Sequence, residues 1–325
     1  MACTGLAFPN FDAFALIAVI AFVGTVNPST GDLGVLVPLE HAMLAHGVPD
    51  RERTRTFARY SLIGALSMAA GSLAAALPDF IVLADVSRID AFKMMFYAYA
   101  ALGLASVALY RYLPHVVMEK RPSAAPLGPS RGVVYKLAAL FSLDAFAGGF
   151  VVQSLLALWL FERFDMSLSA ASLFFFWSSV LSAFSYPVAA WLAKRIGLIN
   201  TMVYTHIPSS LFLILAAFSP DLILTLVLLL LRSALSQMDV PTRTSYVMAV
   251  VTPAERTAAA SVTAVPRSLA SSISPALTSV LLATPFTGLP LIVCGVLKIV
   301  YDVALLYTFR HVKPPEEKSG QQDVV

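Results

Sequence analysis

Charged residues are scarce in this sequence. Asp, Glu, Lys and Arg make up 13% of its 325 residues, against about 25% in soluble domains. The formal net charge is only +3, and the basic residues form no stripe with interleaved aromatic side chains. The composition therefore argues against a soluble fold, and we expect no nucleic-acid partner.

Residues that carry enzymatic or metal chemistry are also few. The two cysteines, Cys3 and Cys294, lack metal-ligand spacing, and the five histidines are scattered. The phosphate-binding pattern Gly-x-x-x-x-Gly-Lys-Ser/Thr is missing, which argues against an internal ATPase. No Ser/His/Asp constellation is visible either. We therefore expect no metal site, no cofactor and no enzymatic activity.

Hydrophobic residues are abundant. They account for 58% of the chain, which has a mean hydropathy of +0.79, and they fall in successive runs of the length that crosses a bilayer, about 20 residues per helix. The runs predict nine spans, at residues 12–45, 60–77, 91–112, 133–161, 168–192, 199–218, 222–251, 258–282 and 289–309. The predicted fold is an all-α polytopic membrane helical bundle within a lipid bilayer.

Basic residues concentrate in alternate connections between these spans. Residues 51–59 and 111–136 are rich in Lys and Arg, whereas the intervening connections hold few. The positive-inside rule places the basic side, and with it the C-terminus, in the cytoplasm. We expect a multi-pass protein of the inner (plasma) membrane.

Composition also divides the chain into domains. Residues 114–130 are rich in Pro, Ser and charged residues and are predicted to form a cytoplasmic linker. The linker separates a three-helix bundle at residues 1–113 from a six-helix bundle at residues 131–310. The polar tail at residues 311–325 is expected to be disordered.

A weak internal repeat relates the two bundles. Asp32 and the later run 52–54 (Glu-Arg-Thr) recur at nearly the same separation as Asp239 and the run 255–257. Such repeats are how many transporters build two halves around a central path. If the last three helices repeat the first three, three further helices would precede residue 1. We then expect an N-terminally truncated twelve-helix protein, the alternative being a native nine-helix chain.

The residues AWLAKRIG at 190–197 match a known loop signature. With the predicted linker and the six-plus-six helix pattern, they make the chain resemble the major facilitator superfamily, specifically helices four to twelve of a twelve-helix member. The family pattern is Gly-x-Leu-Ala-Asp-Arg-x-Gly. Leu192, Ala193, Arg195 and Gly197 fit it, whereas Ala190 and Lys194 depart from it.

The resemblance implies a cytoplasmic gate loop made by Lys194, Arg195 and Gly197. In the family, the arginine of this loop commonly meets an acid on a neighbouring helix, which here would pair Arg195 with Asp239. The alternative is that the two basic residues only determine topology. The family's antiporter signature is not matched at residues 64–71, so drug/proton antiport is not predicted.

Ionisable residues inside predicted spans are candidates for transport because a charge in the bilayer centre costs about 2.5–3.5 kcal/mol on insertion scales. They are Asp32, Asp144, Arg232, Asp239, Arg267, Lys298 and Asp302. Lys298 and Asp302 lie four residues apart on one helix, so we expect them to neutralise each other. Gln153 and Gln237 are polar candidates for the same path.

Asp144 is the first candidate for coupling. It follows Lys136 by eight residues, about 12 Å along a helix, and a buried carboxylate there could take up and release a proton. The alternative is a structural Asp hydrogen-bonded to a neighbouring helix. The predicted function is a secondary active transporter of a small organic solute, coupled to protons. The alternative function is a truncated, non-transporting membrane fragment or interaction protein.

Overall fold

The computed structural model describes residues 2–23, 44, 48, 52–112 and 126–312. Most of the first predicted span, Asp32 and most of the predicted linker lie outside these residues. Every regular element among those described is a helix. The predicted all-α fold is confirmed.

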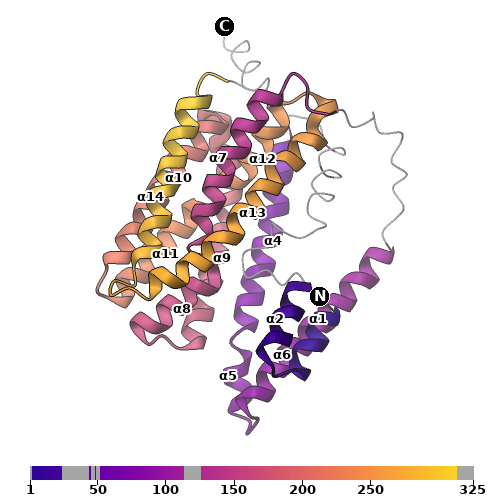
Figure 1. Cartoon of the computed structure of the whole chain (residues 1–325), viewed down its shortest axis with the longest axis vertical. Helices are drawn as coiled ribbons and strands as arrows, with labels where there is room; N and C mark the ends of the chain where they lie inside the picture. Colours follow the sequence, from indigo (N-terminus) through magenta and orange to yellow (C-terminus); the bar gives the residue numbers. More distant parts are fainter. Residues whose placement is uncertain (1, 24–43, 45–47, 49–51, 113–125, 313–325) are drawn as a thin grey trace.

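The N-terminal helices form two groups (Figure 1). Their bounds are α1 (Ala2–Ala7), η1 (Phe8–Asn10), α2 (Phe14–Val23), α4 (Arg53–Ala74), α5 (Leu77–Val82) and α6 (Arg88–Tyr112). Helices α1, η1 and α5 pack against α6, whereas α4 packs along α9 and against α12. Helix α4 therefore joins the N-terminal part to the C-terminal bundle.

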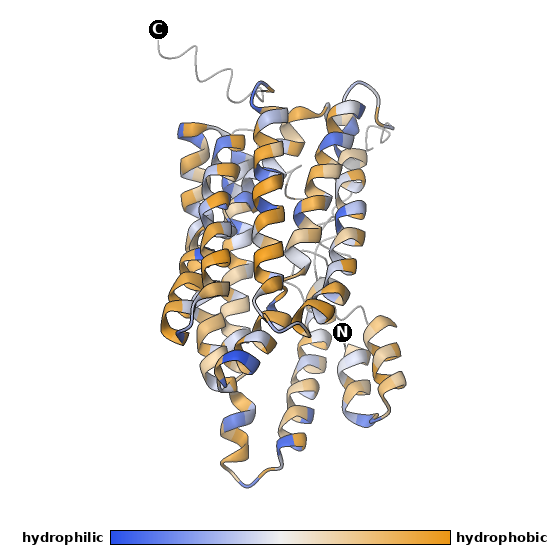
Figure 2. Ribbon diagram, turned by 60° about the vertical axis from the view of Figure 1, so that its left-hand side comes forward, coloured by the Kyte–Doolittle hydropathy of each residue, from blue (hydrophilic) through white to orange (hydrophobic). Residues whose placement is uncertain are grey.

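The C-terminal bundle contains the remaining elements. They are α7 (Arg131–Gly149), α8 (Gln153–Phe164), α9 (Leu168–Ile196), α10 (Leu198–Phe218), α11 (Leu222–Ser236), α12 (Asp239–Val250), η3 (Pro253–Glu255), α13 (Arg256–Leu282) and α14 (Leu289–Phe309). Helix α7 packs against α13 and α14, and α10 packs against α14, α11 and α12. Figure 2 shows long hydrophobic stretches along these helices, as expected of a lipid-facing surface.

Seven helical segments among the described residues are long and apolar enough to cross a membrane. They are Thr54–Val82, Arg88–Leu109, Arg131–Phe164, Leu168–Ile196, Leu198–Phe218, Leu222–Val250 and Leu289–Phe309. The predicted count of nine is approximate. The predicted span 258–282 is present as α13, which is not among the seven; it is rich in Ala, Ser and Thr and packs closely on α7. Of the first predicted span, only the short helix α2 is described.

Three of the described spans are interrupted: Thr54–Val82 between α4 and α5, Arg131–Phe164 between α7 and α8, and Leu222–Val250 between α11 and α12. Between α7 and α8, Phe150 and Val151 donate their backbone N–H groups to residues three positions earlier, and α8 restarts at Gln153. Between α11 and α12, Met238 donates in the same way to Leu235. Irregular backbone at membrane depth is tolerated where protein or water covers it, and it commonly adjoins transport sites.

The junction between α9 and α10 requires a glycine. Gly197 ends α9 and precedes α10 with φ +87° and ψ 163°, a conformation that L side chains rarely adopt. Its backbone carbonyl also accepts a bond from the Thr201 hydroxyl. The last residue of the loop motif is therefore explained by the sharp connection between two consecutive spans.

Helix α4 meets α9 through small side chains. Ala58 and Ala65 lie buried on α4 against Ala183, Ala190 and Tyr186 of α9. Small residues allow helix backbones to approach closely in a membrane. This seam holds the N-terminal part against the C-terminal bundle.

Glu255 connects Gly128 and Ser130, just before α7, to the turn that precedes α13. Its carboxylate accepts hydrogen bonds from the Thr252 hydroxyl, from the backbone N–H of Gly128, and from both the hydroxyl and the backbone N–H of Ser130. These bonds favour the ionised form and lower the pKa of Glu255 from 4.5 to about 2.

We expect Glu255→Gln to reduce the acid sensitivity of the protein. Because the folded-state pKa is lowered, the ionised carboxylate stabilises the fold above pH 4.5 and this contribution is lost as the pH falls towards about 2. Thermal unfolding in detergent across this range measures the effect. Glu162→Gln, at an exposed carboxylate outside these bonds, is the matched control. If the stability of Glu255→Gln falls with decreasing pH as steeply as that of the wild type, the expectation is contradicted.

Candidate functional site: a buried charge network

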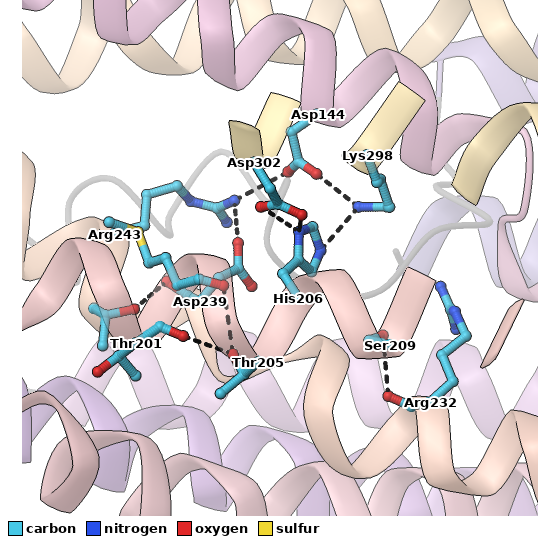
Figure 3. A network of polar contacts seen from close by, with 12 residues as sticks. Asp144, Thr201, Thr205, His206, Ser209, Arg232, Asp239, Arg243, Lys298 and Asp302 are labelled. Atoms are coloured by element: carbon cyan, nitrogen blue, oxygen red, sulfur yellow. Dashed lines mark hydrogen bonds and ion pairs between the residues drawn. The ribbon is translucent and has the colours of Figure 1, made fainter. Parts of the chain in front are cut away.

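Six ionisable side chains from four helices meet inside the C-terminal bundle (Figure 3). They are Asp144 of α7, His206 of α10, Asp239 and Arg243 of α12, and Lys298 and Asp302 of α14. All lie in the middle part of membrane-length segments; Lys298, for example, is the tenth of the 21 residues of α14. A charge at such a depth is costly unless it is paired.

Asp144 lies between two cations. Its Oδ1 accepts a hydrogen bond of 2.6 Å from Lys298 Nζ, and its Oδ2 accepts one of 3.2 Å from Arg243 Nη1. Arg243 Nη1 also donates to Asp239 Oδ2 at 2.8 Å, and its guanidinium lies 5.6 Å from the centre of the Phe141 ring. Asp144 is only 5% exposed. It therefore links α7 to both α12 and α14 through charge-assisted hydrogen bonds.

His206 forms the other end of the network. Its Nδ1 lies 3.0 and 3.1 Å from the two carboxylate oxygens of Asp302, and its Nε2 lies 3.3 Å from Lys298 Nζ. An ammonium group only donates, so Nε2 must accept, and the ring hydrogen is assigned to Nδ1, which donates to Asp302. The arrangement shown is that of a neutral imidazole between a cation and a carboxylate.

The network lies between two apolar clusters. On one side are buried residues that include Leu137, Met202 and Leu305. On the other are buried residues that include Leu213 and Leu291. Along α7, α10 and α14, Asp144, His206 and Lys298 occur between residues of one cluster and residues of the other. Because apolar side chains lie on both sides, charges here are screened far less than at a protein surface.

The fixed charges of the network do not cancel. Asp144, Asp239 and Asp302 are three carboxylates, whereas Arg243 and Lys298 are the two permanent cations. With the imidazole neutral and the carboxylates ionised, the set carries one net negative charge. One additional proton would make it neutral.

Asp144 and Asp239 are brought together as members of one network through Arg243. The predicted pairing of Arg195 with Asp239 is wrong. Asp239 is buried against Arg243 on its own helix, whereas Arg195 is exposed at the end of α9 with its guanidinium 4.4 Å from the centre of the Trp191 ring. Lys194 is likewise exposed beside it.

Lys298 and Asp302, which the sequence pairs with each other, both form their hydrogen bonds with other helices. Lys298 bonds to Asp144 on α7, and Asp302 bonds to His206 on α10. Both residues thus use α14 to contact other helices, so the pair belongs to the network rather than to a local i, i+4 interaction.

The remaining candidates lie on α11, on α13 and at the α11–α12 break. Arg232 lies on α11, and its backbone carbonyl accepts a hydrogen bond from Ser209 Oγ. Its guanidinium makes no hydrogen bond or ion pair among the described residues. Figure 3 shows this side chain away from the network. Gln237 lies at the α11–α12 break, and Arg267 is half-buried on α13. Asp32 lies outside the described residues.

Gln153 lines a cavity between α4, α8 and α9. The cavity has a volume of about 320 Å³. Its lining residues are all uncharged: Ser72, Ala75, Gln153, Ser154, Ala157, Phe161, Leu168, Ala171, Ser172 and Phe175. Hydroxyl and amide groups beside aromatic rings can contact a small molecule that has both polar and apolar parts.

Sequence reasoning missed His206 and Arg243. Arg243 lies inside the predicted span 222–251, four residues after Asp239, which is the spacing of a helical ion pair. His206 was set aside as one of several scattered histidines. A titratable group inside an otherwise apolar predicted span was the available signal.

Comparisons with known proteins identify similar chains. The sequence model described as Major Facilitator Superfamily matches residues 137–324. An uncharacterized membrane protein of Saccharomyces cerevisiae, YJR124C, is 23% identical over 95% of this chain and 77% of its own length.

Two solved structures have a similar fold. The human organic anion transporter MFSD10 (TETRAN) aligns with a TM-score of 0.62 at 15% identity, covering 94% of this chain and 74% of its own. A bacterial homolog of the human lysosomal transporter Spinster, inward-facing and unoccupied, aligns with a TM-score of 0.59 at 14% identity, covering 94% and 78%.

Proposed function

Because this chain belongs to the major facilitator superfamily, we propose that it is a secondary active transporter that couples the movement of a small organic solute to protons. The observation that carries the proposal is the buried network of six ionisable groups, in which three carboxylates face two permanent cations. A network that lacks one proton in a low-dielectric layer gives a membrane protein a place to bind a proton during each cycle.

The seam between α4 and α9 supports alternating access. Near one end of the seam, Thr54 of α4 hydrogen-bonds to Ser245 of α12. Near the other end, Ser169 of α9 donates to Asp79 of α5. Two polar contacts at opposite ends of one pair of packed helices are suited to opening one at a time while the alanine-lined middle acts as the pivot.

The solute class is proposed from two features. The cavity beside Gln153 has an uncharged lining, and Arg232 supplies a guanidinium that is not paired with any described side chain. Both suit an organic acid with an apolar part. The human structure with a similar fold is described as an organic anion transporter, so organic anions are the first solutes to test.

Orientation follows from the basic residues. Successive spans run in opposite directions, so the start of α7, the end of α9 and the end of α14 lie on the same side of the bundle (Figure 1). Lys136 is near the start of α7, and Arg195 is near the end of α9. We propose that this end, with the C-terminus, faces the cytoplasm and that the protein resides in the plasma membrane.

Transport in liposomes tests the proposal. Purified protein is reconstituted, a pH gradient is imposed, and movement of labelled lactate, succinate, citrate and benzoate is followed with and without a protonophore. We expect one or more of these anions to move, and the protonophore to abolish net movement against the anion's own gradient. If no solute moves under any gradient, the alternative of a non-transporting interaction protein is favoured.

Asp144→Asn should uncouple transport. The substitution removes the charge that holds Lys298 and Arg243 together, so we expect loss of gradient-driven movement in the same liposomes. Asp90→Asn is the matched control, since Asp90 is exposed near the start of α6 and bonds to Ser87. Gradient-driven transport by Asp144→Asn at the wild-type rate would contradict a role for Asp144 in coupling.

A further inference from the structure

We propose that the transported proton binds at the His206–Asp302 pair and that its binding breaks the contact between His206 and Lys298. The inference rests on the proposed proton coupling and names the site within the network that accepts the proton. Asp144, the first candidate from the sequence, then has the different role of holding Lys298 and Arg243.

The pairing of each carboxylate identifies the acceptor. Asp144 faces two permanent cations, at 2.6 and 3.2 Å, and Asp239 faces Arg243 at 2.8 Å. Both carboxylates therefore already have a permanent cation as a hydrogen-bond partner. Among these three carboxylates, only Asp302 has a neutral hydrogen-bond partner, the imidazole of His206 in the tautomer assigned above. An added proton at this pair gives Asp302 a positively charged hydrogen-bond partner, the imidazolium of His206, and brings the net charge of the network to zero.

His206 faces ionisable groups on several helices. From α14 it faces Lys298, Asp302 and Tyr301, whose ring lies edge-on at 6.1 Å and whose buried hydroxyl has no hydrogen-bond partner among those residues.

The other helices around α10 contribute the remaining charges. Helix α12 contributes Asp239 and Arg243, which bond to each other, and α7 contributes Asp144, which is bonded to both cations. On α11, Arg232 lies apart from the network (Figure 3). The two charged residues of α9, Lys194 and Arg195, are exposed at its end.

Proton binding changes a hydrogen bond into a repulsion. In the neutral ring, Nε2 accepts from Lys298 Nζ at 3.3 Å. When Nε2 takes up a proton it becomes a donor, so two positively charged donors face each other and the contact cannot persist. Lys298 keeps its 2.6 Å bond to Asp144, and His206 keeps its bond to Asp302. The polar link between α10 and α14 at Lys298 is thereby lost, while the link between α7 and α14 remains.

No covalent bond is formed or broken beyond the N–H bond itself. The proton enters from one side of the membrane, the net charge of the network changes from minus one to zero, and release to the other side restores the bond between Nε2 and Lys298. The coupling between proton and helix arrangement is thus a property of a single imidazole nitrogen with two alternative hydrogen-bond roles.

Nitrogen-15 NMR of histidine tests the site directly, with the proton as the ligand. His41, His46, His115 and His311 are replaced by Gln so that His206 gives the only imidazole signal. We expect Nε2 to be an acceptor at high pH and to become protonated as the pH falls. Lys298→Gln removes the facing cation, so His206 should become protonated at a higher pH than in the wild type, whereas Asp302→Asn should have the opposite effect.

Arg232→Gln is the matched control, because it removes a cation from the same bundle that does not contact His206; its titration should stay at the wild-type position. A His206 signal that does not change between pH 5 and 9, or that is unaffected by Lys298→Gln, would overturn the proposal.

Transport assays distinguish the proposed proton site at His206 from the proposed function as a proton-coupled transporter. His206→Gln should lose gradient-driven movement of the carboxylate that wild type transports, while still exchanging labelled for unlabelled carboxylate across the membrane. Gradient-driven transport by His206→Gln would overturn the site and leave the proposed function intact. A normal titration of His206 in a wild-type protein that transports nothing would overturn the proposed function and the coupling role, leaving only a proton-binding pair.

Discussion

Arg243→Met is expected to destabilise the protein by about 3–5 kcal/mol, the cost of removing one partner from a buried ion pair. Arg243 bonds to Asp144 and Asp239 in a layer bounded by apolar clusters. Without the guanidinium, Asp239 loses its hydrogen-bonded cation, and Asp144 retains the bond from Lys298. The measurement is thermal or denaturant unfolding of the purified protein in detergent, together with its yield in the membrane.

Arg232→Met is the matched control for this prediction. The chemical change is the same and both residues lie in the segment Leu222–Val250, yet the guanidinium of Arg232 has no ion pair among the described residues. We expect little loss of stability from it. Adding Asp239→Asn to Arg243→Met should recover part of the loss because it removes one of the unpaired charges. Equal losses in the two single variants would show that the pairing does not stabilise the fold.

The helices could be predicted from the sequence because hydropathy is a local property. Each of the seven membrane-length helical segments, from Thr54–Val82 to Leu289–Phe309, overlaps one of the apolar runs predicted from the sequence. The predicted span 258–282 shows the limit of that signal. Helix α13 is held in the bundle by small-residue packing on α7 rather than by its own hydropathy.

The breaks within spans were harder to locate. Neither the α7–α8 break nor the α11–α12 break coincides with a proline at the interruption: the residues there are Phe150 to Val152 and Gln237 to Met238. By contrast, Pro187 and Pro208 lie inside continuous helices. Tertiary packing rather than local propensity therefore decides where these spans are interrupted.

The candidate site could be predicted only in part, for a geometric reason. That Asp144 and Asp239 are functional candidates follows from their depth alone. Their partners depend on how four helices are rotated about their axes, which a single sequence does not specify. Lys298 had a plausible local partner in Asp302, but contacts with α7 and α10 prevailed. Arg195 had a plausible partner by resemblance, but Asp239 faces the inside of the bundle.

The second large effect is expected at Gly149, the last residue of α7. A Cβ placed there would overlap with Ser274 Oγ and lie 2.8 Å from the backbone carbonyl oxygen of Ser271 on α13. A hydroxyl can move, whereas a helix backbone must shift as a whole. We therefore expect Gly149→Ala to cost about 1–3 kcal/mol through overpacking and to separate α7 from α13.

Gly132→Ala in the same helix is the control, since a Cβ at that position meets no atom within 4 Å and alanine favours a helix more than glycine does. Combining Gly149→Ala with Ser274→Ala should restore part of the stability, because the removed oxygen is the nearest clash, but not all of it, because the Ser271 carbonyl remains. Unfolding in detergent provides the measurement. Since α7 also carries Asp144, a displaced α7 should lengthen the bonds of Asp144 to Lys298 and Arg243. Wild-type stability in Gly149→Ala would show that the close approach of α7 and α13 is not required for the fold.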